Sequence, residues 1–256
     1  VYDLANNSRT AHLPNKRQPD FSAGGYLVAN GEGGGVDDLV RMDAGGGNER
    51  LISKHPEDAH PHWSPSGVSV VFDSNYHGDQ RHRIYLLADA GARGDGQWLE
   101  YSGREIFGRY PVYLSNWRIA YNGCNSWEGG GSCGIYAADS EGSLPVRATD
   151  QPGDIPTDNL GSQVLFTSAR GGNWDVYAVN WDGSGLRRLT NNPARDGLAT
   201  ASPDGKHIAF VSDRDGTWAV YVMDTSGGGQ RKLFDLQGEY GTGDQDWIQE
   251  RISWGP

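Results

Sequence analysis

The feature that most constrains the fold is an internal repeat, which recurs at about 40 to 50 residues along most of the chain. Its clearest copies are residues 61–72 and 199–210, each of which predicts a strand, a Ser-Pro-x-Gly turn and a second strand. In both copies an aromatic strand follows, and a Gly-rich turn then leads into a short outer strand. Four short strands per repeat are typical of a β-propeller, in which neighbouring blades bury their apolar faces against one another.

The repeat also predicts the number of blades. Five units account for most of the chain, with starts near residues 19, 61, 111, 156 and 199. Residues 252–256 align with the innermost strand at 61–65, and residues 1–4 align with the third strand at 220–223. We therefore expect a sixth blade from 249–256 plus 1–14, whose second strand should lie just upstream of Val1. The prediction is a single all-β domain over 1–256: a six-bladed β-propeller with four-stranded antiparallel blades and a ring closed by a composite N-/C-terminal blade.

Charge and hydropathy exclude two classes of partner. The formal net charge of -11 repels phosphate backbones, so we expect no nucleic acid. The mean hydropathy is -0.65, and no segment approaches the roughly 20 apolar residues of a spanning helix, so we expect no direct membrane insertion. Because Val1 already lies in predicted strand, we expect the chain to be a mature or excised part of a longer chain or surface assembly.

The two cysteines lie on either side of a predicted hairpin loop. Cys124 and Cys133 are each flanked by predicted strand, at 117–122 and 134–138. A hairpin brings two such side chains together, so we predict a disulfide, which indicates an oxidising compartment. The alternatives are a reduced pair or half of a metal site.

The best copies of the repeat resemble a known family. Residues 202–216, Ser-Pro-Asp-Gly-Lys-His-Ile-Ala-Phe-Val-Ser-Asp-Arg-Asp-Gly, are followed by Val-Tyr-Val-Met-Asp at 220–224, and together they resemble the TolB-like WD-type propeller repeat. The resemblance implies a fold that hosts many functions. The Cys-flanked hairpin and the Ile-Ser-Trp-Gly-Pro ending further resemble ectodomains of bacterial surface or signalling proteins. An extracytoplasmic place follows from this likeness, whether periplasmic, secreted or on the cell surface.

Three functions remain open on this basis. The leading hypothesis is an extracytoplasmic, sensor-like binding domain without catalytic activity, which takes a protein or a small-molecule or glycan ligand. One alternative is a structural or assembly module of a bacterial cell-surface complex. The other is a metal-assisted polysaccharide lyase or hydrolase. The chain contains neither a Gly-x-Ser-x-Gly elbow nor a His-Glu-x-x-His motif.

Propeller connections predict where a binding site would lie. The blade-to-blade connections and the loops between second and third strands share one face, and they are the longer set. We expect ligand-binding residues at the rim of an axial funnel on this face: Asp58, His60, His62, Arg109, Asp154, Asp196 and Asp246. Asp58 and Asp196 share one repeat position, at which an aspartate can instead cap a loop onto a neighbouring blade.

Five of the seven histidines fall within the second unit. His60 and His62 stand two apart on a predicted strand, so alternation should point both the same way. With His77 and His82 they form a candidate set for a divalent metal, the one cofactor considered. The His-Pro-His segment resembles a stretch of the metal-dependent oligogalacturonate lyases. The alternative is that these are rim histidines without a ligand.

Overall fold

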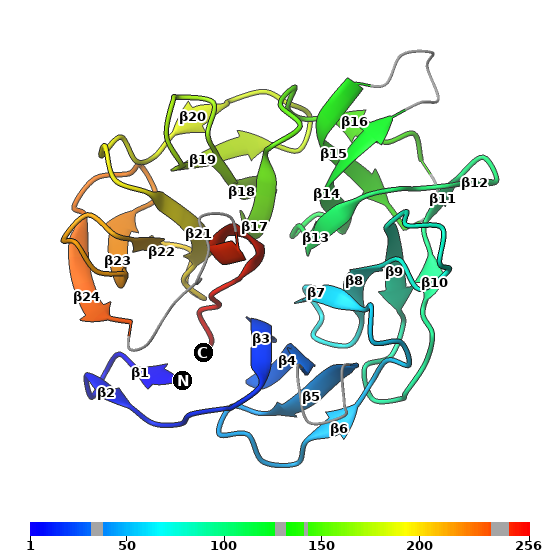
Figure 1. Cartoon of the computed structure of the whole chain (residues 1–256), viewed down its shortest axis with the longest axis horizontal. Helices are drawn as coiled ribbons and strands as arrows, with labels where there is room; N and C mark the ends of the chain where they lie inside the picture. Colours follow the sequence, from blue (N-terminus) through cyan, green and yellow to red (C-terminus); the bar gives the residue numbers. More distant parts are fainter. Residues whose placement is uncertain (32–37, 126–131, 141–142, 237–245) are drawn as a thin grey trace.

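Four-stranded antiparallel sheets stand around a common axis in the computed structural model of the chain, which describes residues 1–31, 38–125, 132–140, 143–236 and 246–256 (Figure 1). These residues form five such blades. The β-propeller and its four-stranded blades are as predicted, but the prediction of six blades is wrong. Parts of the loops at 30–37, 123–133 and 235–248, which belong to the face predicted to hold a site, lie outside the described residues.

The strands of each blade follow one another from the axis outward. Blade 1 contains β3 (Lys16–Phe21), β4 (Tyr26–Gly31), β5 (Leu39–Asp43) and β6 (Arg50–Leu51). Blade 2 contains β7 (Ala59–Trp63), β8 (Val70–Ser74), β9 (Arg83–Leu87) and β10 (Gln97–Trp98). Blade 3 contains β13 (Arg109–Tyr113), β14 (Arg118–Asn125), β15 (Ser132–Asp139) and β16 (Val146–Arg147). Blade 4 contains β17 (Ile155–Leu160), β18 (Gln163–Ser168), β19 (Asp175–Asn180) and β20 (Arg187–Arg188). Blade 5 contains β21 (Asp196–Ala201), β22 (His207–Ser212), β23 (Ala219–Asp224) and β24 (Arg231–Asp235). A small hairpin, β11 (Glu100–Tyr101) and β12 (Arg104–Glu105), joins blades 2 and 3.

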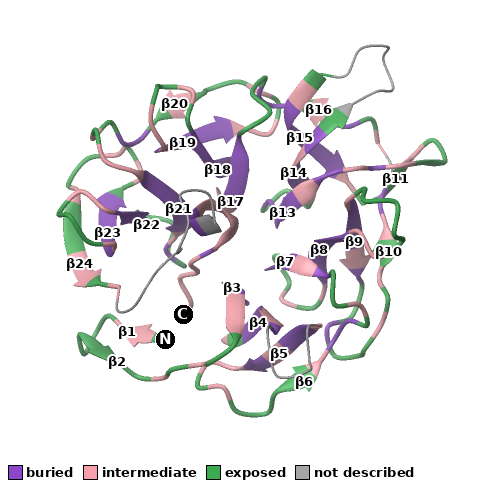
Figure 2. Ribbon diagram, viewed as in Figure 1, coloured by how far each residue is buried: buried purple, intermediate pink, exposed green. Residues whose placement is uncertain are grey.

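Apolar residues on both faces of the middle strands explain why the blades stack. All five residues of β8 are buried, as are five of the six in β22, whereas β6 and β24 are exposed or half-buried (Figure 2). Separate apolar clusters fill the contacts between blades 1 and 2, 2 and 3, 3 and 4, and 4 and 5. Adjacent blades therefore bury their apolar faces against each other and share a core.

The innermost strands of all five blades have a bulge, and in four of them it carries a residue with a positive φ angle. Gln18, His60, Tyr110 and Leu198 have positive φ angles, and the register with the second strand shifts at each of these places. Such a bulge re-aims the side chains on either side of it. Alternation along these strands is therefore broken close to the axis.

The sector between blade 5 and blade 1 explains the missing sixth blade. The hairpin of β1 (Tyr2–Asp3) and β2 (Ser8–Arg9) forms a sheet of its own, and residues 250–256 form no strand. The prediction placed these segments as outer and innermost strands of one blade. An innermost strand and a third strand cannot pair directly, because a second strand must lie between them and the sequence supplies none here. The sector therefore holds two separate pieces (Figure 1).

The C-terminal segment takes up part of this sector. The 3-10 helix η1 (Asp246–Gln249) buries Trp247 completely against Leu198 and Val211. Farther along, Ser253 Oγ accepts a hydrogen bond from Phe21 N at 2.9 Å in blade 1. Trp254 N donates to Thr200 Oγ1 at 3.2 Å in blade 5. The segment thus bridges the first and last blades.

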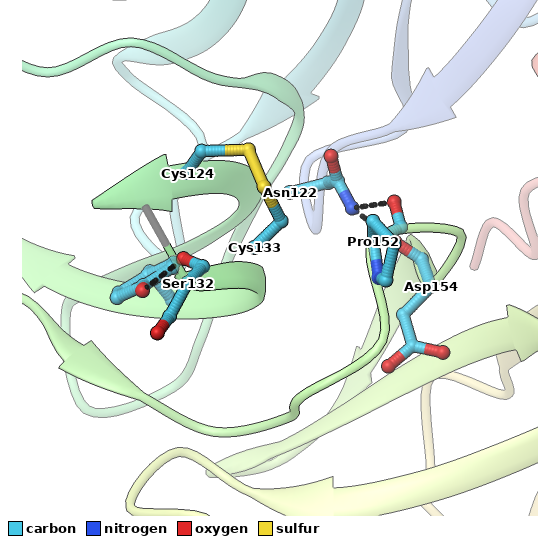
Figure 3. Close-up of a disulfide and its surroundings, with 7 residues drawn as sticks. Asn122, Cys124, Ser132, Cys133, Pro152 and Asp154 are labelled. Atoms are coloured by element: carbon cyan, nitrogen blue, oxygen red, sulfur yellow. Dashed lines mark hydrogen bonds between the residues drawn. A yellow bond between two sulfur atoms is a disulfide. The ribbon is translucent and has the colours of Figure 1, made fainter. Parts of the chain in front are cut away.

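Cys124 and Cys133 face each other across β14 and β15 and form a disulfide, as predicted (Figure 3). Nearby, Asn122 Nδ2 donates to Pro152 O at 2.9 Å and to Asp154 O at 2.8 Å, so the hairpin is tied to the connection that leads into blade 4 (Figure 3).

In the described ranges, no helix has the length and apolarity that crossing a bilayer would require.

Candidate functional site

Polar side chains on equivalent positions of the innermost strands meet at the propeller axis. His62 Nε2 of blade 2 lies 3.2 Å from Asp158 Oδ1 of blade 4. Thr200 Oγ1 donates to the other oxygen, Asp158 Oδ2, at 2.6 Å. On the opposite side, His62 Nδ1 lies 3.7 Å from Asp20 Oδ2, and Ser253 Oγ lies 3.0 Å from Asp20 Oδ1. These contacts form a continuous polar layer across the axis.

A second layer is built around Arg251, whose exposed fraction is 5%. Its Nη1 donates to His60 O at 3.3 Å and to Pro61 O at 3.2 Å, and its Nη2 donates to Pro111 O at 2.9 Å. The C-terminal segment therefore reaches across the axis to blades 2 and 3. Gln18 Nε2 of blade 1 donates to Gln249 O at 3.1 Å and completes this layer.

Two histidines share the buried carboxylate of Asp73. His60 Nδ1 lies 2.7 Å from Asp73 Oδ2, and His82 Nδ1 lies 2.8 Å from Asp73 Oδ1. His60 Nε2 accepts a hydrogen bond from Gln18 Nε2 at 3.0 Å, an assignment that follows because Gln18 Oε1 accepts from His60 N. Burial lowers the pKa of His60, so the neutral ring carries its proton on Nδ1. Burial alone would raise the pKa of Asp73, but the two imidazoles hold it below its ordinary value.

His62 differs because both of its ring nitrogens face acceptors. Nδ1 lies 2.9 Å from Trp63 O, and Nε2 faces Asp158. Burial alone would lower the pKa of His62, but the carboxylates of Asp20 and Asp158 raise it. Tyr113 N also donates to His62 Nδ1 at 3.4 Å, so this nitrogen faces a donor as well as an acceptor. The two carboxylates favour the protonated form of His62 beside Asp158.

Of the three aspartates predicted at the rim, Asp154 in blade 4 and Asp196 in blade 5 pair with arginines, whereas Asp58 in blade 2 does not. Asp196 accepts two hydrogen bonds from Arg214 Nη2, both at 2.9 Å, and at the equivalent place in blade 4 Arg170 Nη2 donates to Asp154 Oδ2 alone. Both arginines stand two residues after a serine that ends the second strand. Blade 2 has Tyr76 at this position.

Asp58 therefore lacks a guanidinium partner. Its side chain is fully buried, and Oδ1 has no hydrogen-bond partner in the structure. Burial raises the pKa of Asp58 to about 6, although hydroxyls of Ser74 and Ser53 act to lower it.

The remaining predicted residues are scattered. The guanidinium of Arg109 lies 4.8 Å from the centre of the Tyr110 ring, and Asp246 begins η1. Of the four histidines proposed as metal ligands, His60 and His82 meet at Asp73. His62 lies beyond the bulge with other partners, and the His77 ring stacks on Tyr76 at 4.2 Å. Within the described ranges, no group of three or more His, Cys, Asp or Glu side chains is arranged to hold a metal ion. The metal set stays a prediction.

Seven residues of the two axial layers and the Asp73 site were not predicted from the sequence: Gln18, Asp20, Asp73, Asp158, Thr200, Arg251 and Ser253. A signal for two partners existed, because Asp20 and Thr200 share the repeat position of His62. Residue 252 aligned with Pro61, so Arg251, one position earlier, aligned with His60. Asp73 gave no signal, because it lies within an apolar second strand.

A hollow of about 320 Å³ lies away from the axis, at the outer edge of blade 2. Its lining includes Leu86, Trp98 and Glu100. Trp98 Nε1 already donates to Glu100 Oε1 at 2.7 Å, so these polar groups serve one another.

Comparison with known proteins agrees with this architecture. Residues 158–246 match the family model of the TolB beta propeller domain. A Tol-Pal system protein TolB of Anaeromyxobacter dehalogenans is 31% identical over 171 residues, which is 66% of this chain and 28% of that protein. The chain is therefore similar in sequence to TolB propellers, most clearly over residues 158–246.

Solved structures show the same fold for this propeller. A structure assigned as TolB from Agrobacterium tumefaciens has a TM-score of 0.75 at 24% identity, covering 92% of this chain and 87% of that one. TolB from Acinetobacter baumannii has a TM-score of 0.64 at 20% identity, covering 86% of this chain and 52% of that one. The chain spans only 28% of the length of the curated relatives it matches.

Proposed function

We propose that this propeller is a protein-binding domain that acts outside the cytoplasm and has no catalytic role. The observation that carries the proposal is the filled axis. Small-molecule and catalytic sites are concave, but here Gln18, His60, His62 and Arg251 are buried side chains that hydrogen-bond to one another or to backbone carbonyls. A ligand that binds this molecule therefore meets its outer surfaces, which suits a macromolecule.

Two further observations support the partner class and the compartment. The relatives from Anaeromyxobacter dehalogenans are proteins of a Tol-Pal system, which favours another component of such a system as the partner. The disulfide of Cys124 and Cys133 favours an oxidising compartment. The lyase or hydrolase alternative is not favoured, because the candidate ligand histidines divide between two separate hydrogen-bond networks.

Binding to purified proteins tests this proposal. The chain should be titrated by calorimetry with the Tol and Pal proteins encoded in the same genome, at about 0.15 M salt. We expect saturable binding of at least one of them with a Kd in the micromolar range or tighter. Absence of heat with every component at 100-fold higher concentrations, or turnover of a polyuronate with added manganese, would contradict the proposal.

A further inference from the structure

Blade 3 has tryptophan where other blades have glycine. The turn between the first and second strands ends on Gly25, Gly67 and Gly205, with φ angles of 77, 68 and 67°. Trp117 occupies this place in blade 3 with a φ of 66°. In all four turns the N–H of this residue donates to the carbonyl three positions earlier, so the turn is the same. A left-handed conformation costs a residue other than glycine about 1 kcal/mol or more.

Packing does not compensate Trp117 for this strain. Its exposed fraction is 52%, one of the highest among the large apolar residues described. A strained residue that persists without burial points to a role outside the fold. Exposed tryptophan is also among the residues that contribute most to protein interfaces.

Two leucines lie on neighbouring turns. Leu144 and Leu186 have exposed fractions of 41% and 47%. Arg118, next to Trp117, places its guanidinium 3.9 Å over the ring of Trp181, which begins the turn that contains Leu186. The same turn lies against the outer strand of blade 3, since a Cβ added at Gly183 would be 3.2 Å from Ala148 O.

We call Trp117, Leu144 and Leu186 the turn patch. All three follow a first or third strand, so antiparallel pairing places them on one face of the propeller, opposite the blade connections. Tyr26 and Val68 extend the same face over blades 1 and 2. Five of the seven exposed large apolar side chains in the described ranges therefore lie on this face.

Three aspartates lie on this face, on turns of blades 4 and 5. Asp182, Asp204 and Asp224 each cap their own turn, and hydrogen bonds from Ser184, Ser202 and Ser226 hold their pKa values below the ordinary one. Arg187, next to Leu186, is already engaged with Gln163 Oε1 at 2.8 Å. The face thus carries ionised aspartates beside its apolar residues, in a chain whose net charge is -11.

We propose that the turn patch is the docking surface for a protein partner that presents an apolar pocket edged by lysine or arginine. This inference rests on the proposed function and names the face that performs it. Trp117 fills the pocket, and the two leucines exclude water around it. The aspartates contribute attraction to the basic edge, which salt weakens.

The test compares Trp117→Gly and Leu186→Ser with a matched control. Gln80→Gly also relieves a positive φ, of 59°, at an exposed residue, but in a loop on the opposite face. The purified Tol and Pal proteins of the same genome serve as probes in calorimetry. We expect Trp117→Gly to weaken binding about 30-fold or more and Leu186→Ser to weaken it less. The control should bind as the wild type does.

Folding and binding are separable here. Gly occurs at this position in other blades, so Trp117→Gly should keep the far-UV spectrum and the urea midpoint of the wild type. If the wild type binds and Trp117→Gly binds equally well, the docking surface is refuted while the proposed function stands. If no probe binds the wild type, both fail together. Binding of a neutral oligosaccharide that depends on Trp117 would replace the protein partner with a glycan and also overturn the inference.

Discussion

A single substitution between repeats changes the chemistry of one buried carboxylate. Asp154 and Asp196 have arginine partners, whereas the same turn in blade 2 carries Tyr76, whose ring stacks on His55 at 3.7 Å. Asp58 is left with the hydroxyls of Ser74 and Ser53 and with the backbone N–H of His55, which donates to Oδ2 at 3.3 Å. Blade 2 therefore has the stack of Tyr76 on His55 where blades 4 and 5 have an ion pair. The carboxylate of Asp58 is buried without a cation beside it, which makes its ionised form unfavourable.

This unfavourable ionisation should appear as a pH dependence of stability. The pKa of Asp58 rises from 3.8 to about 6 on folding, so the folded state binds the proton more tightly. The penalty is absent below about pH 3.8 and complete above about pH 6, where it reaches roughly 3 kcal/mol. Asp58→Asn cannot ionise. Its free energy of unfolding should therefore gain about 3 kcal/mol on the wild type between pH 4 and pH 7, measured by urea unfolding.

Asp196→Asn provides the control for this experiment. It removes the bidentate contact with Arg214 and should be less stable than the wild type at both pH values. If the difference between Asp58→Asn and the wild type does not change with pH, Asp58 is not the titrating group.

At the scale of elements, the hairpin of β14 and β15 is the one whose closure can be tested covalently. Its disulfide joins residues nine apart. A loop this short limits the entropic stabilisation to about 3 kcal/mol. We expect the double variant Cys124→Ser, Cys133→Ser to fold and to lose up to this amount. Dithiothreitol should lower the Tm of the wild type to that of the variant; an equal shift in both would show that the disulfide is not the cause.

Local turn chemistry made the blades predictable, whereas their irregularities were not. The Ser-Pro-x-Gly turns of blades 2 and 5 and the strands around them depend on neighbours in sequence, and comparison with these two units indicated the other three blades. The bulge at His60 depends on contacts with Gln18 and Asp73, which come from other strands. Because of it, His60 and His62 have different partners, although alternation predicted one side for both.

The closing sector was mispredicted for a similar reason. Alignment compared residues 252–256 with an innermost strand, but these residues form no strand, because strand formation needs a hydrogen-bonding neighbour and the described residues place none here. The place of Arg251 could not be predicted, because its acceptors lie about 140 to 190 positions away in the chain. The axial site could thus be located only from the three-dimensional arrangement of the blades.

For the molecule as a whole, Arg251 is the side chain that joins the closing segment to the far side of the ring. Arg251→Met would remove the hydrogen bonds to three carbonyls and the guanidinium that interacts with Asp20, Asp73 and Asp158. We expect a loss of about 3 kcal/mol or more in the free energy of unfolding. Lys206→Met removes an exposed charge and should change stability by no more than about 0.5 kcal/mol. Equal effects of the two substitutions in urea unfolding would argue against a role for Arg251 in closure.

The position of the sealing segment also orders the events of synthesis. Trp247, Arg251 and Ser253 follow all five blades along the chain, so a ribosome must have made every blade before the axis can be sealed. A nascent chain that stops short of Trp247 leaves the Gln18 amide without Gln249 O and the carbonyls around Pro61 open to water. Translation through Trp254 is therefore needed before the C-terminal segment can bridge the first and last blades and fill the axis.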